Sequence, residues 1–235
     1  DLRTSFGPRY RKADDYLQQL DAVVQSFSRG VATAGERFSR LRQEALLANP
    51  LLENLHLLVV KRKPQLPGRG WQPPPGLGIG MPSNHECNTS LNRQGFDNEI
   101  AILQSVRPEG RLSTLYRPPH RGYVGELDLH EDGKRFLFTR SDAENWQVWE
   151  LDVDGRGLRQ VSQAPADVDC FDACYLPDGR IVLGSTASFQ AVPCWHGLRR
   201  VSNLHRMNAD GTGMRQLCFD QDHDLHPTVV ANGQV

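Results

Sequence analysis

Two interleaved ladders of turn glycines constrain the fold of this chain more than any other feature. The first ladder has spacings of 45 and 56 residues, and the second has spacings of 46 and 54. The first consists of Gly110, Gly155 and Gly211, and the second of Gly133, Gly179 and Gly233. Two hairpins in each period of roughly 45–55 residues is the spacing of four-stranded propeller blades. The sequence therefore predicts an all-β repeat with about two full blades and parts of two more.

The ends of the chain lead us to expect a fragment of a larger protein. The sequence begins at Asp1 without an initiator methionine, and it stops at Val235, two residues after Gly233. The second ladder predicts that a new strand starts at this point. A propeller ring closes with about four to eight blades, so the predicted propeller is incomplete.

The first domain, residues 1–50, is predicted to be a helical hairpin. A stripe of apolar residues at helical spacing is formed by Leu17, Leu20, Val24 and Phe27. Gly30 is a helix stop, and Thr33 with Glu36 matches the capping box that opens a second helix. We expect this hairpin to pack on an edge or face of the propeller. A pair of helices that docks a partner is the alternative.

The second domain, residues 51–235, is predicted to be the partial propeller, with a long insertion at 64–97. If its strands are labelled a to d from the ring axis outward, the b–c and d–a connections share one end of the blades. The connections at this end are long, and those at the other end are tight acidic-glycine turns. Long connections carry function more often than tight turns, so the long-loop face is the expected working face. The segment 76–80, GLGIG, lacks the strand and helix of a phosphate-binding loop.

The long-loop face collects carboxylate, imidazole and thiol side chains, which are the ligands that transition metals use. The candidate metal ligands are His223, His226, Asp169 and Asp222. The alternative interpretation is that these side chains cap turns and bond between blades. Further polar residues expected on this face are His85, Glu86, Cys87, His120, Asp167, Cys170, Asp172, Cys194, His196, Cys218, Asp220 and Asp224. No nucleophile elbow or catalytic triad can be assembled from the sequence, so no catalytic residue is assigned.

Charge, hydropathy and cysteine content exclude several classes of function. The formal net charge is −1, which gives no general attraction to nucleic acid. No apolar run approaches the roughly 20 residues that span a bilayer. The five cysteines form neither a CxxC pair nor the CxxCH signature of c-type haem attachment. All acidic residues after residue 160 are aspartates, which indicates turn chemistry because an aspartate side chain bonds readily to its own backbone.

Several phrases of the sequence resemble known proteins. PDGRIVLGST, RMNADGTGMRQL and ELDVDGRGLRQVS look like TolB-type propeller repeats, which are similar to WD repeats. Together with SNHECNTSLNRQGFDNEIAIL they resemble the middle domain of hydrazine synthase alpha subunit-like proteins, over about residues 45–235. The resemblance implies a TolB-like propeller in a larger bacterial protein that is periplasmic or exported. It also implies c-type haem, which this chain could use only if flanking segments supplied CxxCH.

Three functions are compatible with the sequence. The first is a non-catalytic scaffold or ligand-binding domain of a larger hydrazine synthase alpha subunit-like protein, with flanking domains or subunits on the long-loop face. The second is part of a c-type-haem oxidoreductase, with its haem motifs outside this sequence. The third is a metal-assisted lyase or hydrolase on the long-loop face, with a divalent metal. The sequence favours the first.

Overall fold

The computed structural model describes residues 1–62 and 86–235, which divide into two compact units. The first unit contains residues 1–58 and 102–113, and the second contains residues 59–101 and 114–235. The predicted loop segment 76–80 and His85 lie outside the described residues. The predicted domain boundary at residue 50 stays a prediction.

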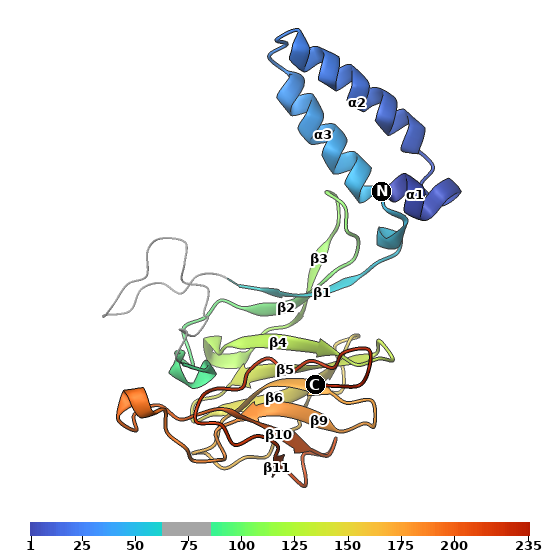
Figure 1. Cartoon of the computed structure of the whole chain (residues 1–235). Helices are drawn as coiled ribbons and strands as arrows, with labels where there is room; N and C mark the ends of the chain where they lie inside the picture. The colour runs from blue at the N-terminus through green and yellow to red at the C-terminus, as the bar shows by residue number, and fades with distance from the viewer. Residues whose placement is uncertain (63–85) are drawn as a thin grey trace. The chain divides into compact units, whose positions relative to one another are not determined.

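The first unit is built on a helical hairpin, as predicted (Figure 1). Its core is formed by Tyr10, Ala13, Tyr16, Val23 and Leu41, and the Tyr10 hydroxyl donates to the carbonyl of Ala45 at 2.7 Å. This bond joins the start of the unit to the second helix of the hairpin. The helices are α1 (Leu2–Phe6), α2 (Ala13–Ser28) and α3 (Ala34–Leu47), with 3-10 turns η1 (Gly7–Arg9) and η2 (Pro50–Leu52).

Two details of the hairpin differ from the prediction. The predicted stripe of Leu17, Leu20, Val24 and Phe27 is solvent-exposed, and α2 instead buries Ala13, Tyr16 and Val23. The helix has apolar residues on two adjacent faces, and the contact with α3 uses only one of them. The helix α3 does begin after Thr33, but the Thr33 side chain makes no capping hydrogen bond, so the capping box does not form.

The strands of the described residues form three antiparallel sheets. The order in the three-stranded sheet is β1-β2-β3, and the two four-stranded sheets run β4-β5-β6-β7 and β8-β9-β10-β11 in space (Figure 1). The strands are β1 (Leu57–Lys61), β2 (Glu99–Leu103), β3 (Leu112–Tyr116), β4 (Val124–Leu129), β5 (Arg135–Ser141), β6 (Trp146–Asp152), β7 (Arg159–Gln160), β8 (Cys170–Tyr175), β9 (Ile181–Ser185), β10 (Asn203–Met207) and β11 (Arg215–Gln216). Short 3-10 turns lie between them at η3 (Asn88–Ser90), η4 (Pro119–Arg121) and η5 (Pro193–Trp195).

The two four-stranded sheets are complete blades, and they repeat the same hairpin chemistry. In each tight turn an aspartate Oδ1 accepts the backbone N–H two residues later, as Asp132 does from Lys134 at 2.8 Å. The glycine that follows has a positive φ, for example 67° at Gly133 and 83° at Gly179, which a residue with a Cβ adopts only with strain. The same bond occurs at Asp154, Asp178 and Asp210. These bonds account for Asp178 and Asp210 among the aspartates that follow residue 160.

The blades pack face to face, with β8 against β4, β5 and β6. The core between them includes Leu137, Val148, Ile181, Leu183 and Met207, all essentially inaccessible to solvent. The architecture confirms the predicted fold class, an incomplete β-propeller preceded by a helical hairpin: two sheets are full four-stranded blades, and among the described residues a three-stranded sheet forms part of another. Among the described helices, none is both long and apolar enough to cross a membrane.

Candidate functional site on the long-loop face

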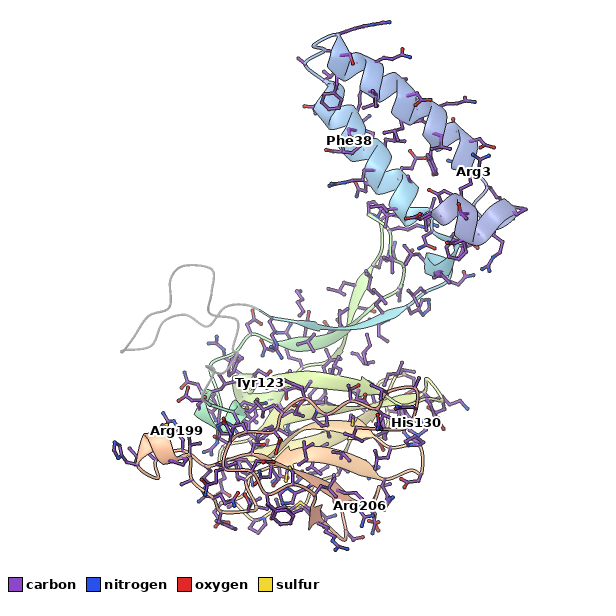
Figure 2. The ribbon with its side chains drawn as sticks, in the orientation of Figure 1. Arg3, Phe38, Tyr123, His130, Arg199 and Arg206 are labelled. Carbon is purple, nitrogen blue, oxygen red and sulfur yellow. The ribbon has the colours of Figure 1, made fainter. Side chains whose placement is uncertain are left out.

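One end of the blades carries a pocket that we call the arginine pocket. Its volume is about 260 Å³. Figure 2 shows Tyr123 and Arg199 at this end of the strands and His130 at the opposite end. The lining residues come from the insertion that ends at residue 97, the connection at 163–171 and the insertion at 187–201. They are Thr89, Arg93, Ala166, Asp167, Asp169, Leu198, Arg199 and Arg200. The pocket thus brings together three of the connections that strand order places on one face.

The three arginines of the pocket are held in different ways. Arg93 lies 3.8 Å from the Asp169 carboxylate, and its buried Nε has no hydrogen-bond partner among the described residues. Arg199 donates from Nε to Glu86 at 2.9 Å. Arg200 donates to the backbone carbonyl of Asp167, and its guanidinium also stacks over the Phe189 ring. Of the three, Arg93 is the arginine whose buried Nε lacks a hydrogen-bond partner among the described residues.

An aromatic layer supports the long-loop face. It is formed by Cys87, Phe96, Tyr123, Trp146 and Phe171, all buried. The Tyr123 ring meets Phe96 and Trp146 edge to face, with ring centroids 5.3 and 5.0 Å apart. Such contacts hold the loop segment after residue 86 against the blades, because each ring buries a large apolar area.

Three ionisable residues occupy the same repeat position, two on the first strands of the blades and one in the segment after β11, and we call them the inner-strand triplet. They are Glu126, Asp172 and His226, and each lies seven residues before a turn glycine of the second ladder. Their φ angles are 50°, 56° and 55°, in the left-handed region that non-glycine residues rarely adopt. In β4 and β8 this position is a β-bulge, which redirects a side chain out of the regular pleat. Backbone strain of this kind is a reason to examine a site for function.

The triplet is linked by hydrogen bonds and charge. Oδ2 of Asp172 accepts the backbone N–H of His226 and lies 2.9 Å from its ring Nδ1. Burial, followed by the nearby charge of Glu126, raises the pKa of Asp172 to about 6, and His226 opposes the shift. Glu126 accepts from the Tyr123 hydroxyl at 2.8 Å and from Asn88 Nδ2 at 3.0 Å, while its Oε2 has no partner among the described residues.

The candidate metal ligands Asp169 and His223 each bond to the backbone of the blade that precedes them in the chain. Oδ1 of Asp169 accepts the backbone N–H of Trp146, the first residue of β6, at 2.9 Å. Nδ1 of His223 accepts the backbone N–H of Ser202, which directly precedes β10, at 3.1 Å. The two side chains thus fill the same repeat position. We call these two contacts the blade latches.

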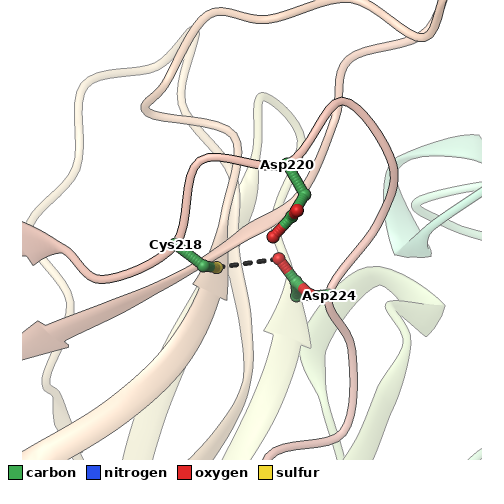
Figure 3. A group of neighbouring side chains, drawn as sticks. All are labelled: Cys218, Asp220 and Asp224. Carbon is green, nitrogen blue, oxygen red and sulfur yellow. Dashed lines mark hydrogen bonds between the residues drawn. The ribbon is translucent and has the colours of Figure 1, made fainter.

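The four candidate ligands do not converge. His226 pairs with Asp172, and Asp222 accepts the backbone N–H of His223 at 2.9 Å. Within residues 1–62 and 86–235, the group of three side chains close enough to share a metal ion is a different one: Cys218, Asp220 and Asp224 (Figure 3). The metal hypothesis for the predicted residues stays a prediction.

The group around Cys218 fits the repeat better than it fits a metal centre. Cys218 Sγ accepts the backbone N–H of Leu204 at 3.1 Å, as Ser162 Oγ accepts that of Val148 at 2.8 Å one blade earlier. The thiol also donates to Asp224 at 2.7 Å. Burial and this hydrogen bond raise the pKa of Cys218 to about 11.

Comparison with known proteins finds similarity among solved structures only. No protein-family model matches the sequence, and no curated protein matches it either. Among solved structures the chain is similar to TolB from Acinetobacter baumannii, at 20% identity over 58% of this chain and 30% of that one, with a TM-score of 0.44. The putative TolB from Agrobacterium tumefaciens is 18% identical over 55% and 41% of the two chains, with a TM-score of 0.42. Hydrazine synthase from Kuenenia stuttgartiensis is 15% identical over 58% and 23%, with a TM-score of 0.47.

The chain spans less than half the length of these structures, and the likeness concerns the fold alone. The c-type haem implied by the sequence resemblance does not fit the residues present, because none of the five cysteines belongs to a CxxCH motif. The residues of the site that the sequence analysis missed include Arg93, Arg199, Arg200 and Glu126. Glu126 could have been found from its spacing to Gly133, which equals the spacing of Asp172 to Gly179.

Proposed function

We propose that this chain is a non-catalytic, ligand-binding propeller domain and that its arginine pocket binds a small anion. The observation that carries the proposal is the unpartnered Nε of Arg93, buried beside a cavity of about 260 Å³ with two further arginines in its wall. A buried donor without a partner is costly, and a ligand oxygen would relieve that cost. Guanidinium groups match the geometry of carboxylate and phosphate oxygens.

The lining of the pocket offers several donors to an anionic ligand. Arg93, Arg199 and Arg200 contribute three positive charges, opposed by the carboxylates of Asp167 and Asp169 in the wall and of Glu86, which pairs with Arg199. Burial raises the pKa of Asp169, which weakens the opposing negative charge inside the pocket. The Thr89 hydroxyl adds a neutral donor on the wall. An incoming oxyanion would therefore meet donors from two separate insertions.

The wider setting of the domain is also a proposal. We infer that it belongs to a larger hydrazine synthase alpha subunit-like protein, exported or periplasmic, whose other domains or subunits contact the long-loop face. The order of the resembling phrases along the chain supports this setting, and the propeller architecture is consistent with it. In such a protein the arginine pocket would lie where a partner's acidic group or a bound metabolite could enter.

Isothermal titration calorimetry with inorganic phosphate and with succinate tests the anion site. We expect one of the two probes to bind the chain, and Arg93→Gln to weaken that binding at least tenfold, because a hydrogen bond to a charged group contributes about 1.5–3 kcal/mol. Preference for phosphate would indicate a phosphorylated ligand, and preference for succinate a carboxylate ligand.

The matched control is Arg156→Gln, which removes an exposed arginine at a tight turn on the opposite face. We expect this variant to bind as the unaltered chain does. Equal loss of binding in both variants would show attraction by diffuse charge and would refute the pocket. Absence of binding by both probes in the unaltered chain would refute the anion site itself.

A further inference from the structure

The helical hairpin exposes a second apolar face that its own core does not use. Leu17, Leu20, Val24 and Phe27 of α2 are between 37% and 54% exposed, although Val23 beside them is buried. Their spacing is 3, 4 and 3 residues, which is the a/d spacing of helices that pack along a shared seam. This face of α2 is therefore patterned for another helix.

The helix α3 continues this face across a groove. The groove has a volume of about 380 Å³, and Phe38 and Leu46 on its α3 side are exposed (Figure 2 labels Phe38). Its apolar lining includes Leu17, Leu20, Phe38, Leu41, Ala45 and Leu46. A continuous apolar surface on two adjacent helices matches the inner face of half a four-helix bundle.

The charges of the two helices are complementary. The charged residues of α2 are all acidic, whereas α3 has three arginines and two glutamates. Asp21 directly follows Leu20 of the apolar seam, and Arg42 lines the groove. Within the described parts of the chain, the side chains of Asp21 and Arg42 form no ion pair. The net charge is thus −3 on α2 (three acidic residues) and +1 on α3 (three arginines minus two glutamates).

We propose that the hairpin pairs with the hairpin of a second copy of this chain to form an antiparallel four-helix bundle. A two-fold axis places α2 of one copy against α3 of the other, so each contact occurs twice. In that arrangement Asp21 meets Arg42 of the second copy, and the two apolar seams close over each other. A second copy of the hairpin thus places its acidic α2 against the positively charged α3 of the first copy, and its α3 against the α2 of the first copy.

Sedimentation equilibrium of the full chain tests the proposal. We expect a species of twice the 26.4 kDa chain mass. The double variant Leu20→Glu with Val24→Glu should weaken the dimer at least a hundredfold, because it places four charges in the closed seam. Circular dichroism should show unchanged helix content, since both side chains are exposed in the single chain. The control, Leu158→Glu, changes an exposed leucine of the second unit and should leave the dimer intact.

A charge exchange tests the orientation of the helices. Asp21→Arg and Arg42→Asp should each weaken the dimer about tenfold, and the double variant should recover most of the loss. A monomeric unaltered chain would overturn the proposal and would indicate that the seam packs on another part of the same chain. An assembly insensitive to the seam variants would also overturn it and would indicate pairing of open strand edges instead.

Discussion

The two blade latches use the same repeat position with different side chains. At the first latch the carboxylate of Asp169 is buried and accepts the N–H of Trp146. At the second latch the imidazole of His223 is half-buried and accepts the N–H of Ser202. Both supply an acceptor for a backbone donor at the start of a third strand. The comparison teaches that both junctions place a hydrogen-bond acceptor at this repeat position. This structural role accounts for an ionisable residue at the position without a role in catalysis.

A second repeat position shows the same substitution of one acceptor by another. Ser162 accepts the N–H of Val148, and Cys218 accepts that of Leu204. Beside Ser162 lies the buried thiol of Cys170, whereas beside Cys218 lies the carboxylate of Asp224. At the first junction the thiol is the neighbour of the acceptor, whereas at the second junction the thiol is itself the acceptor. The cluster that could look like a metal site is a variant of an ordinary inter-blade contact.

Removal of each latch side chain should give the largest difference between the junctions. We expect Asp169→Ala to lower the free energy of unfolding by about 3 kcal/mol, because a buried N–H loses its acceptor and Arg93 loses its counter-charge. His223→Ala should cost about 1 kcal/mol, since water can reach the freed N–H at the more exposed junction. Urea unfolding followed by tryptophan fluorescence measures both values.

Asp169→Asn is the matched variant for this comparison, because it keeps an oxygen acceptor and removes the charge. It should recover roughly half of the lost free energy. If His223→Ala proved as costly as Asp169→Ala, burial would not explain the difference between the latches.

Asp172 of the inner-strand triplet should make stability depend on pH, because burial and then the charge of Glu126 raise its pKa. The folded pKa of Asp172, about 6, lies above its ordinary value of 3.8, so the folded chain holds the proton more tightly than the unfolded chain. Its stabilising contribution is therefore present below pH 3.8 and is lost as the pH rises through about 6. Between about pH 4.5 and 6.5 this loss is about 2 kcal/mol, from 1.36 kcal/mol per pKa unit.

Asp172→Asn should remove this part of the pH dependence, because the amide does not titrate. The measurement is the difference in unfolding free energy between the unaltered chain and the variant across that range. Asp178→Asn, at an exposed turn where Arg180 lowers the pKa of the carboxyl, is the control and should not flatten the profile. An identical pH profile in the chain and in Asp172→Asn would contradict the raised pKa.

The repeat architecture could be predicted from sequence because its signals are local. Gly133 and Gly179 occupy positive-φ turn positions, and each follows an aspartate that bonds to the turn backbone, so composition and spacing report the blades directly. The hairpin was predicted for the same reason. The choice between its two apolar faces was not, because the periodicity of Leu17 and Val24 does not say which neighbour is present.

The candidate site was predicted less well, because it depends on contacts between distant segments. Strand order did place the insertions on one face, and Asp169 does lie there. The nearest partners of Asp169 and His226 are a backbone N–H and Asp172, which no spacing rule reveals. Arg93 gave no signal at all, since its importance comes from burial of Nε beside a cavity built by three connections.

The smallest expected effect concerns the rate at which the thiols of Cys170 and Cys218 react. The two should differ because the thiol of Cys218 is hydrogen-bonded to the carboxylate of Asp224. Burial and the bond to Asp224 raise the pKa of Cys218 to about 11, so alkylation by iodoacetamide at pH 8 should be slow. Asp224→Asn should lower that pKa and speed alkylation of Cys218 several-fold, because the charge that opposes the thiolate is removed. Cys170 should stay unreactive in both proteins because it is fully buried, and exposed Cys194 should react quickly in both. Peptide mass spectrometry separates the sites, and an unchanged rate at Cys218 would show that burial alone, rather than the carboxylate, distinguishes this junction from the first.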